Sequence, residues 1–184
     1  MFVAMAKDIR VVLIRLADRL HNIRTLEAIP IIKQKRIALE TLEVYAPLAE
    51  RLGMGDLKGD LEDSAFPYVH PKEHEWVSII AKPHFAKAEK VTESLIKKIK
   101  LLLEENKINA EVHGRHKRRY SLYKKLQRPD IDKDINKIHD LIAVRIITKD
   151  KLNCYSVLGL VHNHWKPVPY LGVSDFIAQP KPNG

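Results

Sequence analysis

The segment LIAVRIIT, Leu141 to Thr148, decides the fold class of this 184-residue chain. It is rich in β-branched residues, which favour strands over helices. Up to about residue 106, by contrast, apolar residues recur at steps of three and four, the spacing of helices that bury one face. The sequence therefore predicts an α+β fold, in which an all-helical N-terminal part precedes a mixed α/β part.

The expected elements follow from the same patterns and from the residues that interrupt them. We expect helices over residues 4–26, 34–52 and 72–106, a short acidic helical turn over 56–63, and breaks at Pro47 and Pro83. Beyond residue 107 the expected order is strand 108–112, helix 117–127, strand 141–148, helix 152–164 and a further strand at DFIAQP, residues 175–180. This order predicts that the second part is an α/β domain with a sheet.

Composition and charge limit the class of protein. The formal net charge is +9, and the excess lies late in the chain, because residues 111–184 hold 14 Lys or Arg against 7 Asp or Glu. The single cysteine, Cys154, excludes an intrachain disulfide and favours a reducing compartment. No apolar stretch approaches the ~20 residues of a membrane-spanning helix, and no export signal is visible. We therefore expect a cytoplasmic globular protein with an anionic partner.

Four polar side chains share one face of the helix expected over residues 4–26: Asp18, His21, Asn22 and Thr25. They follow one another at helical spacing, and polar groups that pack inward are costly unless they find partners. One interpretation is that Asp18 ligates a divalent metal ion while Asn22 and Thr25 hydrogen-bond a ligand. The alternative is a set of buried hydrogen bonds or a solvated helix face.

The most basic stretch is HGRHKRRYSLYKKLQR, residues 113–128, which has seven Lys or Arg and no acid. Lys117, Ser121 and Lys125 follow at four-residue steps, so a helix would align two ammonium groups and one hydroxyl. This alignment favours a polyphosphate-binding face. An RNA-binding face with stacking tyrosines, or a solvated basic helix face, is the alternative.

Asp140 directly precedes the apolar strand, and Arg145 lies within that strand. An acid at the start of a buried strand can face a cleft and hold Mg²⁺ against phosphates, and an arginine on such a strand needs an anionic or stacking partner. The alternative is a structural pair formed by Asp140 and Arg145 with each other.

Five blocks of sequence span nearly the whole chain in this order: AMAKDIRVVLIRLADRLHNIRTL, KRIALETLEVYAPLAERLGM, GRHKRRYSLYKKL, IHDLIAVRII and FIAQPKPNG. Together they resemble the long RelA/SpoT homologues, bifunctional enzymes that make and degrade the alarmone (p)ppGpp. The resemblance implies that residues 1–60 are the C-terminal end of an HD-type hydrolase domain. It further implies that residues 61–106 are a helical connector and residues 107–184 the N-terminal part of a nucleotidyltransferase-like synthetase domain.

In the hydrolase part the resemblance implies that Asp18 is a ligand of Mn²⁺, and that Asn22 and Thr25 contact the guanosine nucleotide. The other histidine and His-Asp ligands of the family would stand before residue 1. A lone carboxylate cannot hold a catalytic Mn²⁺. We therefore expect no hydrolase activity from this polypeptide.

In the synthetase part the resemblance implies transfer of pyrophosphate from ATP to the 3′-OH of GDP or GTP. The implied roles are adenine packing for Arg115, ATP-phosphate binding for Lys117, Ser121 and Lys125, catalytic Mg²⁺ ligation for Asp140, a further ATP contact for Arg145 and a phosphate contact for Lys181. Cations on the phosphate oxygens and in-line positioning are what such a transfer needs.

Three departures from the family pattern limit the expected activity. The guanine-stacking tyrosine of the family would follow Gly184, the segment 172–175 reads GVSD in place of the usual charged motif, and Arg118 stands where histidine is common. We therefore expect the chain alone to bind ATP weakly and to be inactive. The alternative function is a catalytically dead regulatory module that binds RNA, the ribosome or another partner.

Overall fold

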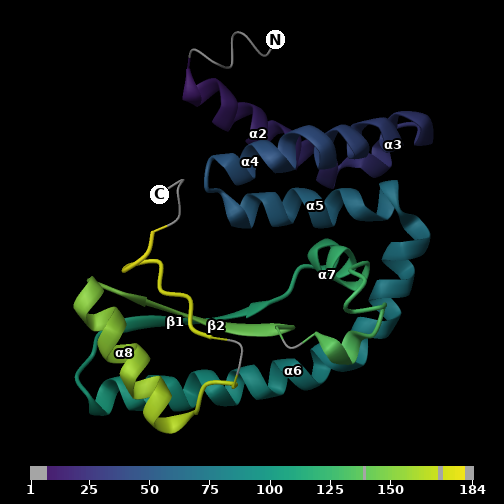
Figure 1. Ribbon diagram of the computed structural model, residues 1–184. Coiled ribbons are helices and arrows are strands. Elements are labelled where there is room, and N and C mark those ends of the chain that lie inside the picture. Colours follow the sequence, from purple (N-terminus) through teal and green to yellow (C-terminus); the bar gives the residue numbers. More distant parts are fainter. Residues whose placement is uncertain (1–7, 139, 170–171, 181–184) are drawn as a thin grey trace. The chain divides into compact units, whose positions relative to one another are not determined.

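The computed structural model describes residues 8–138, 140–169 and 172–180 (Figure 1). The chain divides into two compact units, one formed by Met1–Phe85 with Lys117–Leu141 and the other by Ala86–His116 with Ile142–Gly184. The predicted α+β class is confirmed, because every described element before residue 106 is helical and the strands come later. The predicted domain boundaries at residues 60 and 106 stay a prediction.

The first unit contains the N-terminal helices, which appear in purple and blue in Figure 1. They are α2 (Ile9–Arg24), the short η1 (Leu26–Ala28), α3 (Ile31–Glu40), the π-helical turn η2 (Thr41–Tyr45), α4 (Ala46–Arg51) and α5 (Gly55–Val69). Their buried faces meet in one apolar cluster that includes Leu16, Ile23, Leu26, Ala38, Ala46 and Leu61. The helical spacing in the sequence thus corresponds to real core faces.

Proline acts differently at the two positions where we expected breaks. Pro47 lies at the start of α4, directly after the π-helical turn, and the Ala46 amide donates to the Thr41 carbonyl across that turn. Pro83, however, lies inside α6 (Pro71–Glu105), which continues through it, so the predicted interruption is wrong. Pro83 cannot donate to the carbonyl of Ile79. Ile79 is 64% exposed, so water can satisfy that carbonyl.

A second apolar cluster in the same unit supports the region that carries the basic stretch. Helix α7 (Arg119–Leu126) and the short η3 (Ile135–Lys137) lie in the segment between the two strands. The cluster joins α5, the first part of α6 and this segment through Phe66, Val77, Ala81, Leu122, Leu126, Ile131, Ile135 and Ile138. Burial of the two leucines determines which face of α7 points away from the core.

The second unit contains a two-stranded antiparallel sheet. Strand β1 (Ala110–His116) pairs with β2 (Ile142–Thr148), with Ala110 opposite Thr148 and His116 opposite Ile142. The later part of α6 and helix α8 (Lys151–His164) complete its core with Ile99, Leu103, Val112 and Val157. A Cβ added at Gly114 would lie 2.8 Å from the Thr92 side chain, so this position needs glycine for close packing of β1.

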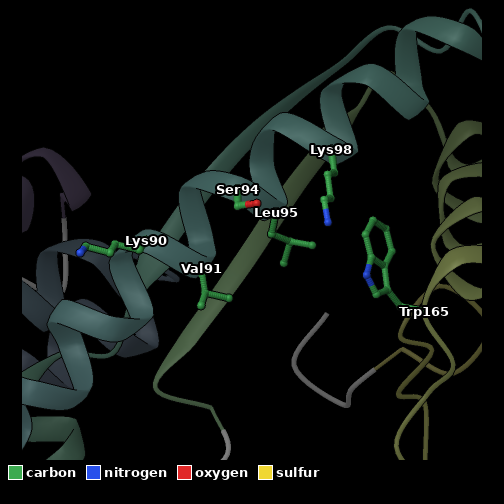
Figure 2. Close-up of a pocket in the computed structure, with 6 residues that line it drawn as sticks. All are labelled: Lys90, Val91, Ser94, Leu95, Lys98 and Trp165. Carbon is green, nitrogen blue, oxygen red and sulfur yellow. The ribbon is translucent and has the colours of Figure 1, made fainter.

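Two further features of this unit concern its surface. A pocket of about 350 Å³ lies between α6 and Trp165, lined on the helix by Lys90, Val91, Ser94, Leu95 and Lys98 (Figure 2).

The strand predicted at residues 175–180 is wrong, because these residues form a turn. The Asp175 carboxylate accepts hydrogen bonds from the Ile177 and Ala178 amides, both at 2.9 Å, and this local bonding competes with strand pairing.

The remaining boundaries differ in detail from the predictions. Helix α5 has 15 residues where a short acidic turn was expected, since Leu61, Ala65 and Phe66 bury fully on its apolar side. Strand β1 begins and ends later than the predicted 108–112. In the described part of the chain, no helix combines the length and the apolar character that crossing a membrane requires.

Candidate functional site

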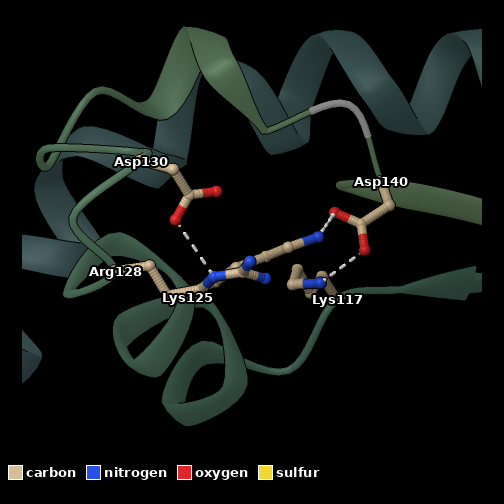
Figure 3. A network of polar contacts seen from close by, with 5 residues as sticks. All are labelled: Lys117, Lys125, Arg128, Asp130 and Asp140. Atoms are coloured by element: carbon tan, nitrogen blue, oxygen red, sulfur yellow. Dashed lines mark hydrogen bonds and ion pairs between the residues drawn. The ribbon is translucent and has the colours of Figure 1, made fainter. Parts of the chain in front are cut away.

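Three charged side chains predicted to act together meet in the first unit (Figure 3). The Lys117 ammonium donates to one oxygen of Asp140 at 2.8 Å, and the Lys125 ammonium donates to the other at 2.7 Å. In the sequence, Lys117 stands 23 positions before Asp140 and Lys125 stands 15 positions before it. Tertiary structure therefore assembles a carboxylate held between two ammonium groups.

The local sequence explains why each group lies there. Lys117 stands just before α7, and its backbone amide donates to the Leu141 carbonyl at 3.0 Å, which holds the two chain segments together. Lys125 lies in the last turn of α7, between the fully buried Leu122 and Leu126. The segment before Asp140 is anchored by the buried Ile138.

The electrostatics of the site favour an ionised carboxylate. Partial burial raises the pKa of Asp140, but the hydrogen bonds and charges of Lys117 and Lys125 outweigh it and lower the pKa to about 2. The Lys117 side chain is only 14% exposed, whereas the Asp140 side chain is 53% exposed. Asp140 is thus open to an approaching ligand while one of its two cations is well enclosed.

Other predicted residues lie on α7 or beside it. Ser121 is half-buried on α7, one helical turn before Lys125, as the spacing predicted. Arg128 pairs with Asp130 at 3.2 Å close to the lysine pair, as Figure 3 shows. The geometry thus brings together Lys117, Lys125 and Asp140, with Ser121 on the same helix as Lys125.

Arg115 and Arg145 lie in the second unit, on the two strands of the sheet. Arg115 is opposite Ala143, and Arg145 is opposite His113, so the two arginines are diagonal neighbours across the strands. Both are exposed, on the same side of the sheet. The two carboxylate oxygens of Asp140 accept hydrogen bonds from Lys117 and Lys125. Lys181 lies outside the described residues.

The polar stripe of α2 is on the surface. Asp18, Asn22 and Thr25 are all exposed, which matches the solvated-face interpretation. The Asn22 amide donates to the Asp18 carboxylate at 3.2 Å, and the Thr25 hydroxyl donates to the His21 carbonyl at 3.2 Å. No group of three or more His, Cys, Asp or Glu side chains placed to hold a metal ion occurs among the described residues. The Mn²⁺ role of Asp18 stays a prediction.

The donor sets differ in how well they fit the implied metal ions. Mg²⁺ is commonly bound by one or two carboxylates together with substrate phosphates, so the carboxylate of Asp140 beside two lysines fits it. Transition-metal sites of the Mn²⁺ kind need several protein ligands. Asp18 with the amide of Asn22 does not by itself make such a set within the described part of the chain.

The basic stretch is largely neutralised within the fold. Five of its seven cations bind acids: Lys117 and Lys125 bind Asp140, Arg118 binds Asp60, Lys124 binds Glu62 and Arg128 binds Asp130. This pairing weighs against a free cationic RNA-binding face, because neutralised side chains release few counterions on binding.

Sequence reasoning missed the acids of α5 that contact α7. Asp60 pairs with Arg118 just before α7, and Glu62 pairs with Lys124 in the last turn of α7. Asp63 accepts hydrogen bonds from the first two amides of α7. The only signal in the sequence is the acidic run GDLEDS, which reads equally well as a solvated helix face. Their partners lie more than 50 residues away, so only the tertiary structure shows them.

The fold defines the class of protein: an α+β protein whose helices precede a small antiparallel sheet, with one carboxylate held between two lysines. Family comparisons agree with this class. Residues 1–55 match the HD domain, and residues 114–184 match the region found in RelA/SpoT proteins. The C-terminal part of the chain thus carries the region found in RelA/SpoT proteins.

Similar proteins align along the entire chain. It is 49% identical over 183 residues to a GTP pyrophosphokinase of Myxococcus xanthus. It is 44% identical over 184 residues to a guanosine-3′,5′-bis(diphosphate) 3′-pyrophosphohydrolase of Haemophilus influenzae. A probable chloroplastic GTP diphosphokinase of Arabidopsis thaliana is 43% identical over 185 residues. These matches cover 100% of the chain but 24%, 27% and 25% of the respective relatives, so the chain spans about a quarter of their length.

Proposed function

We propose that this chain supplies the ATP-phosphate site of a GTP pyrophosphokinase, which transfers pyrophosphate from ATP to the 3′-OH of GDP or GTP. The observation that supports this proposal is the convergence of Lys117 and Lys125 on Asp140. Two ammonium groups beside one open carboxylate suit a triphosphate accompanied by a divalent cation. The relatives named GTP pyrophosphokinase and GTP diphosphokinase are consistent with it.

In this reaction the 3′-oxygen of the acceptor forms a bond to the β-phosphorus of ATP. The bond from that phosphorus to the bridging oxygen of the α-phosphate breaks, AMP leaves, and the 3′-hydroxyl proton is released. Lys117 and Lys125 bind and orient the phosphates and stabilise negative charge as it develops. Asp140 holds Mg²⁺, which neutralises phosphate charge when bound.

Before a nucleotide binds, Asp140 serves as the counterion of both lysines. On binding, the phosphates take over the ammonium groups and leave the carboxylate of Asp140 unpaired, so that Asp140 would be the residue to hold Mg²⁺. Because the pKa of Asp140 is lowered to about 2, the carboxyl group is already ionised near neutral pH and needs no deprotonation for this exchange. The site is therefore ready for an anionic ligand with its own cation at any physiological pH.

The other predicted contacts are part of the same proposal. The hydroxyl group of Ser121, on α7, donates a hydrogen bond to a phosphate of ATP. Arg115 packs on the adenine ring. Arg145 makes a further contact with ATP, and Lys181 binds a phosphate. The exposure of Arg115 and Arg145 on one side of the two-stranded sheet supports their availability to a ligand. The protein acts in the cytoplasm.

Calorimetric titration with ATP and Mg²⁺ tests the site. We expect Lys125→Ala to weaken binding by about tenfold or more, because a charge-assisted hydrogen bond contributes roughly 1.5–3 kcal/mol. Lys58→Ala is the matched control, since Lys58 pairs with Glu50 in the same unit and plays no part in the site. Equal affinities of Lys125→Ala and the wild type would refute the proposal.

A second function is supported by the polar stripe of α2 and by the HD-domain match over residues 1–55. We infer that Asn22 and Thr25 contact the guanosine nucleotide of a 3′-pyrophosphohydrolase and that Asp18 contributes to its metal site. Their exposure on one helix face supports this role. Asn22→Ala should weaken binding of guanosine 3′,5′-bis(diphosphate) in a fluorescence titration, whereas Arg15→Ala on the same helix should not. Unchanged binding in Asn22→Ala contradicts it.

A further inference from the structure

Helix α7, which carries Ser121 and Lys125, is capped by a side chain of another helix. The Asp63 carboxylate of α5 accepts hydrogen bonds from the Tyr120 amide at 2.9 Å and the Arg119 amide at 3.3 Å. These are the first two amides of α7, which have no partner within their own helix. Arg118, the residue before the helix, makes no side-chain cap. Asp63 therefore takes the role of the N-cap from a distance of more than 50 residues.

Two ion pairs hold the same helix against α5. Arg118 binds Asp60 at 2.6 Å, and Lys124 binds Glu62 at 2.8 Å. The Glu62 side chain is 8% exposed, so the second pair is shielded from water on its acidic side. The anchors thus reach the residue before α7, its first amides and its last turn.

Gly59 lies directly beneath the arginine of the first ion pair. A Cβ added at this position would lie 2.9 Å from the Arg118 guanidinium nitrogen Nε and 3.1 Å from its Cγ. The arginine side chain therefore passes directly over the backbone of α5 on its way to Asp60.

A helix as short as α7 depends on such anchors. It has eight residues, fewer than the ~12–15 below which isolated helices are marginal in water. The carboxylate at its N-terminus also stabilises the helix dipole and occupies the end at which an anion would otherwise bind. A phosphate is thereby directed to the lysine side chains rather than to the end of α7.

We infer that Asp63, assisted by the Asp60–Arg118 pair, is a positioning residue for the ATP site. It holds α7 in the one orientation in which Lys125 reaches Asp140 together with Lys117. This inference rests on the proposed function of the lysine–carboxylate site. The residues of α5 named here do not touch the nucleotide, but they determine the orientation of α7, the helix that carries Lys125.

The experiment measures affinity for ATP with Mg²⁺ by calorimetry in the wild type, Asp63→Ala and Asp63→Asn. Asp63→Ala removes both acceptor oxygens, and we expect about tenfold weaker binding, the effect of losing a good cap on the helix. Asp63→Asn retains one acceptor oxygen, so we expect a loss of about threefold or less. Glu40→Gln is the control, because it removes the Arg19–Glu40 pair from the same unit without touching α7.

A double-mutant cycle separates positioning from general stability. If Asp63 acts through Lys125, Asp63→Ala should change the affinity by less than about twofold once Lys125 is already alanine. A purely structural role would lower the melting temperature of Asp63→Ala and leave its affinity for ATP unchanged, and that result overturns the inference. Should Asp63→Ala not fold, Arg118→Ala decides in its place: weaker binding supports the inference and wild-type binding overturns it.

The same data keep the two proposals apart. A wild-type chain that does not bind ATP with Mg²⁺ overturns the proposed function, and this inference with it. A wild-type chain that binds, together with an Asp63→Ala variant that binds equally well, overturns the inference alone.

Discussion

The polar stripe of α2 and the lysine–carboxylate site lie in the same unit and were predicted in the same way, yet they are held very differently. Asn22 bonds to Asp18 four residues away, and Thr25 bonds to the His21 carbonyl, so the stripe is organised by one helix alone. Lys117, Lys125 and Asp140 come from three segments and meet only in the folded chain.

This difference determines which kind of mutation disturbs each group of residues. The stripe keeps its arrangement as long as α2 is helical, and its side chains are exposed. The site depends on the packing of α7 and on the anchor before Asp140, so changes that never touch a ligand can dismantle it. Experiments that disturb packing should therefore separate the two regions.

The largest effect is expected from the core beneath α7. Leu122 is fully buried, and Leu122→Ala should lower the free energy of unfolding by about 2–5 kcal/mol, the cost of an unfilled core position. Leu13→Ala on α2 removes a side chain that is 41% exposed and should cost about 0.5 kcal/mol or less. Urea denaturation followed by tryptophan fluorescence compares them. Equal losses of unfolding free energy in the two variants would contradict the difference drawn between the site and the stripe.

The next effect concerns the carboxylate. In the wild type, Mg²⁺ should strengthen ATP binding, because Asp140 is released to the metal when phosphates bind the lysines. In Asp140→Asn that gain should fall by about tenfold, since an amide is a weaker ligand for Mg²⁺ than a carboxylate. Calorimetry with and without Mg²⁺ measures it. Asp18→Asn serves as the comparison on α2, and an equal loss there would show that the two regions had been assigned wrongly.

A smaller effect is expected in the titration of Asp140. Its pKa of about 2 is depressed, so the lysine contacts stabilise the fold above the ordinary pKa of ~3.9, and this stabilisation is lost as the pH falls toward 2. Lys125→Ala removes one of the two cations and should raise the pKa of Asp140. Carbon-13 NMR of the carboxyl group follows the titration. A pKa that stays at its wild-type value would show that the pair does not persist in solution.

The smallest effect is expected on the stripe itself. Asn22→Ala removes only an exposed hydrogen bond at 3.2 Å, and the melting temperature should change by no more than about 2 °C. Differential scanning calorimetry measures it. A loss several times larger would mean that the stripe supports the fold and is not simply a solvated face.

The sequence predicted most helices, because one-sided burial leaves a spacing that can be read directly. It failed where the outcome depends on surroundings. Pro83 does not break α6, since the carbonyl it leaves unbonded belongs to the exposed Ile79. Residues 175–180 do not form a strand, since Asp175 bonds its neighbouring amides. The length of α5 was not predicted, because its many acidic residues obscure the apolar spacing of its buried side, which contains Leu61.

The sequence by itself determined the α+β order, the helical spacing of Ser121 and Lys125, and, through family resemblance, the residue types of the site; Lys117 was expected on the same helix but lies just before it. Only the tertiary structure decided that both lysines meet Asp140 and that α5 caps α7 through Asp63. The physical reason is range. Helical periodicity is written in neighbours three and four residues apart, whereas hydrogen bonds between distant segments leave no periodic trace in the chain.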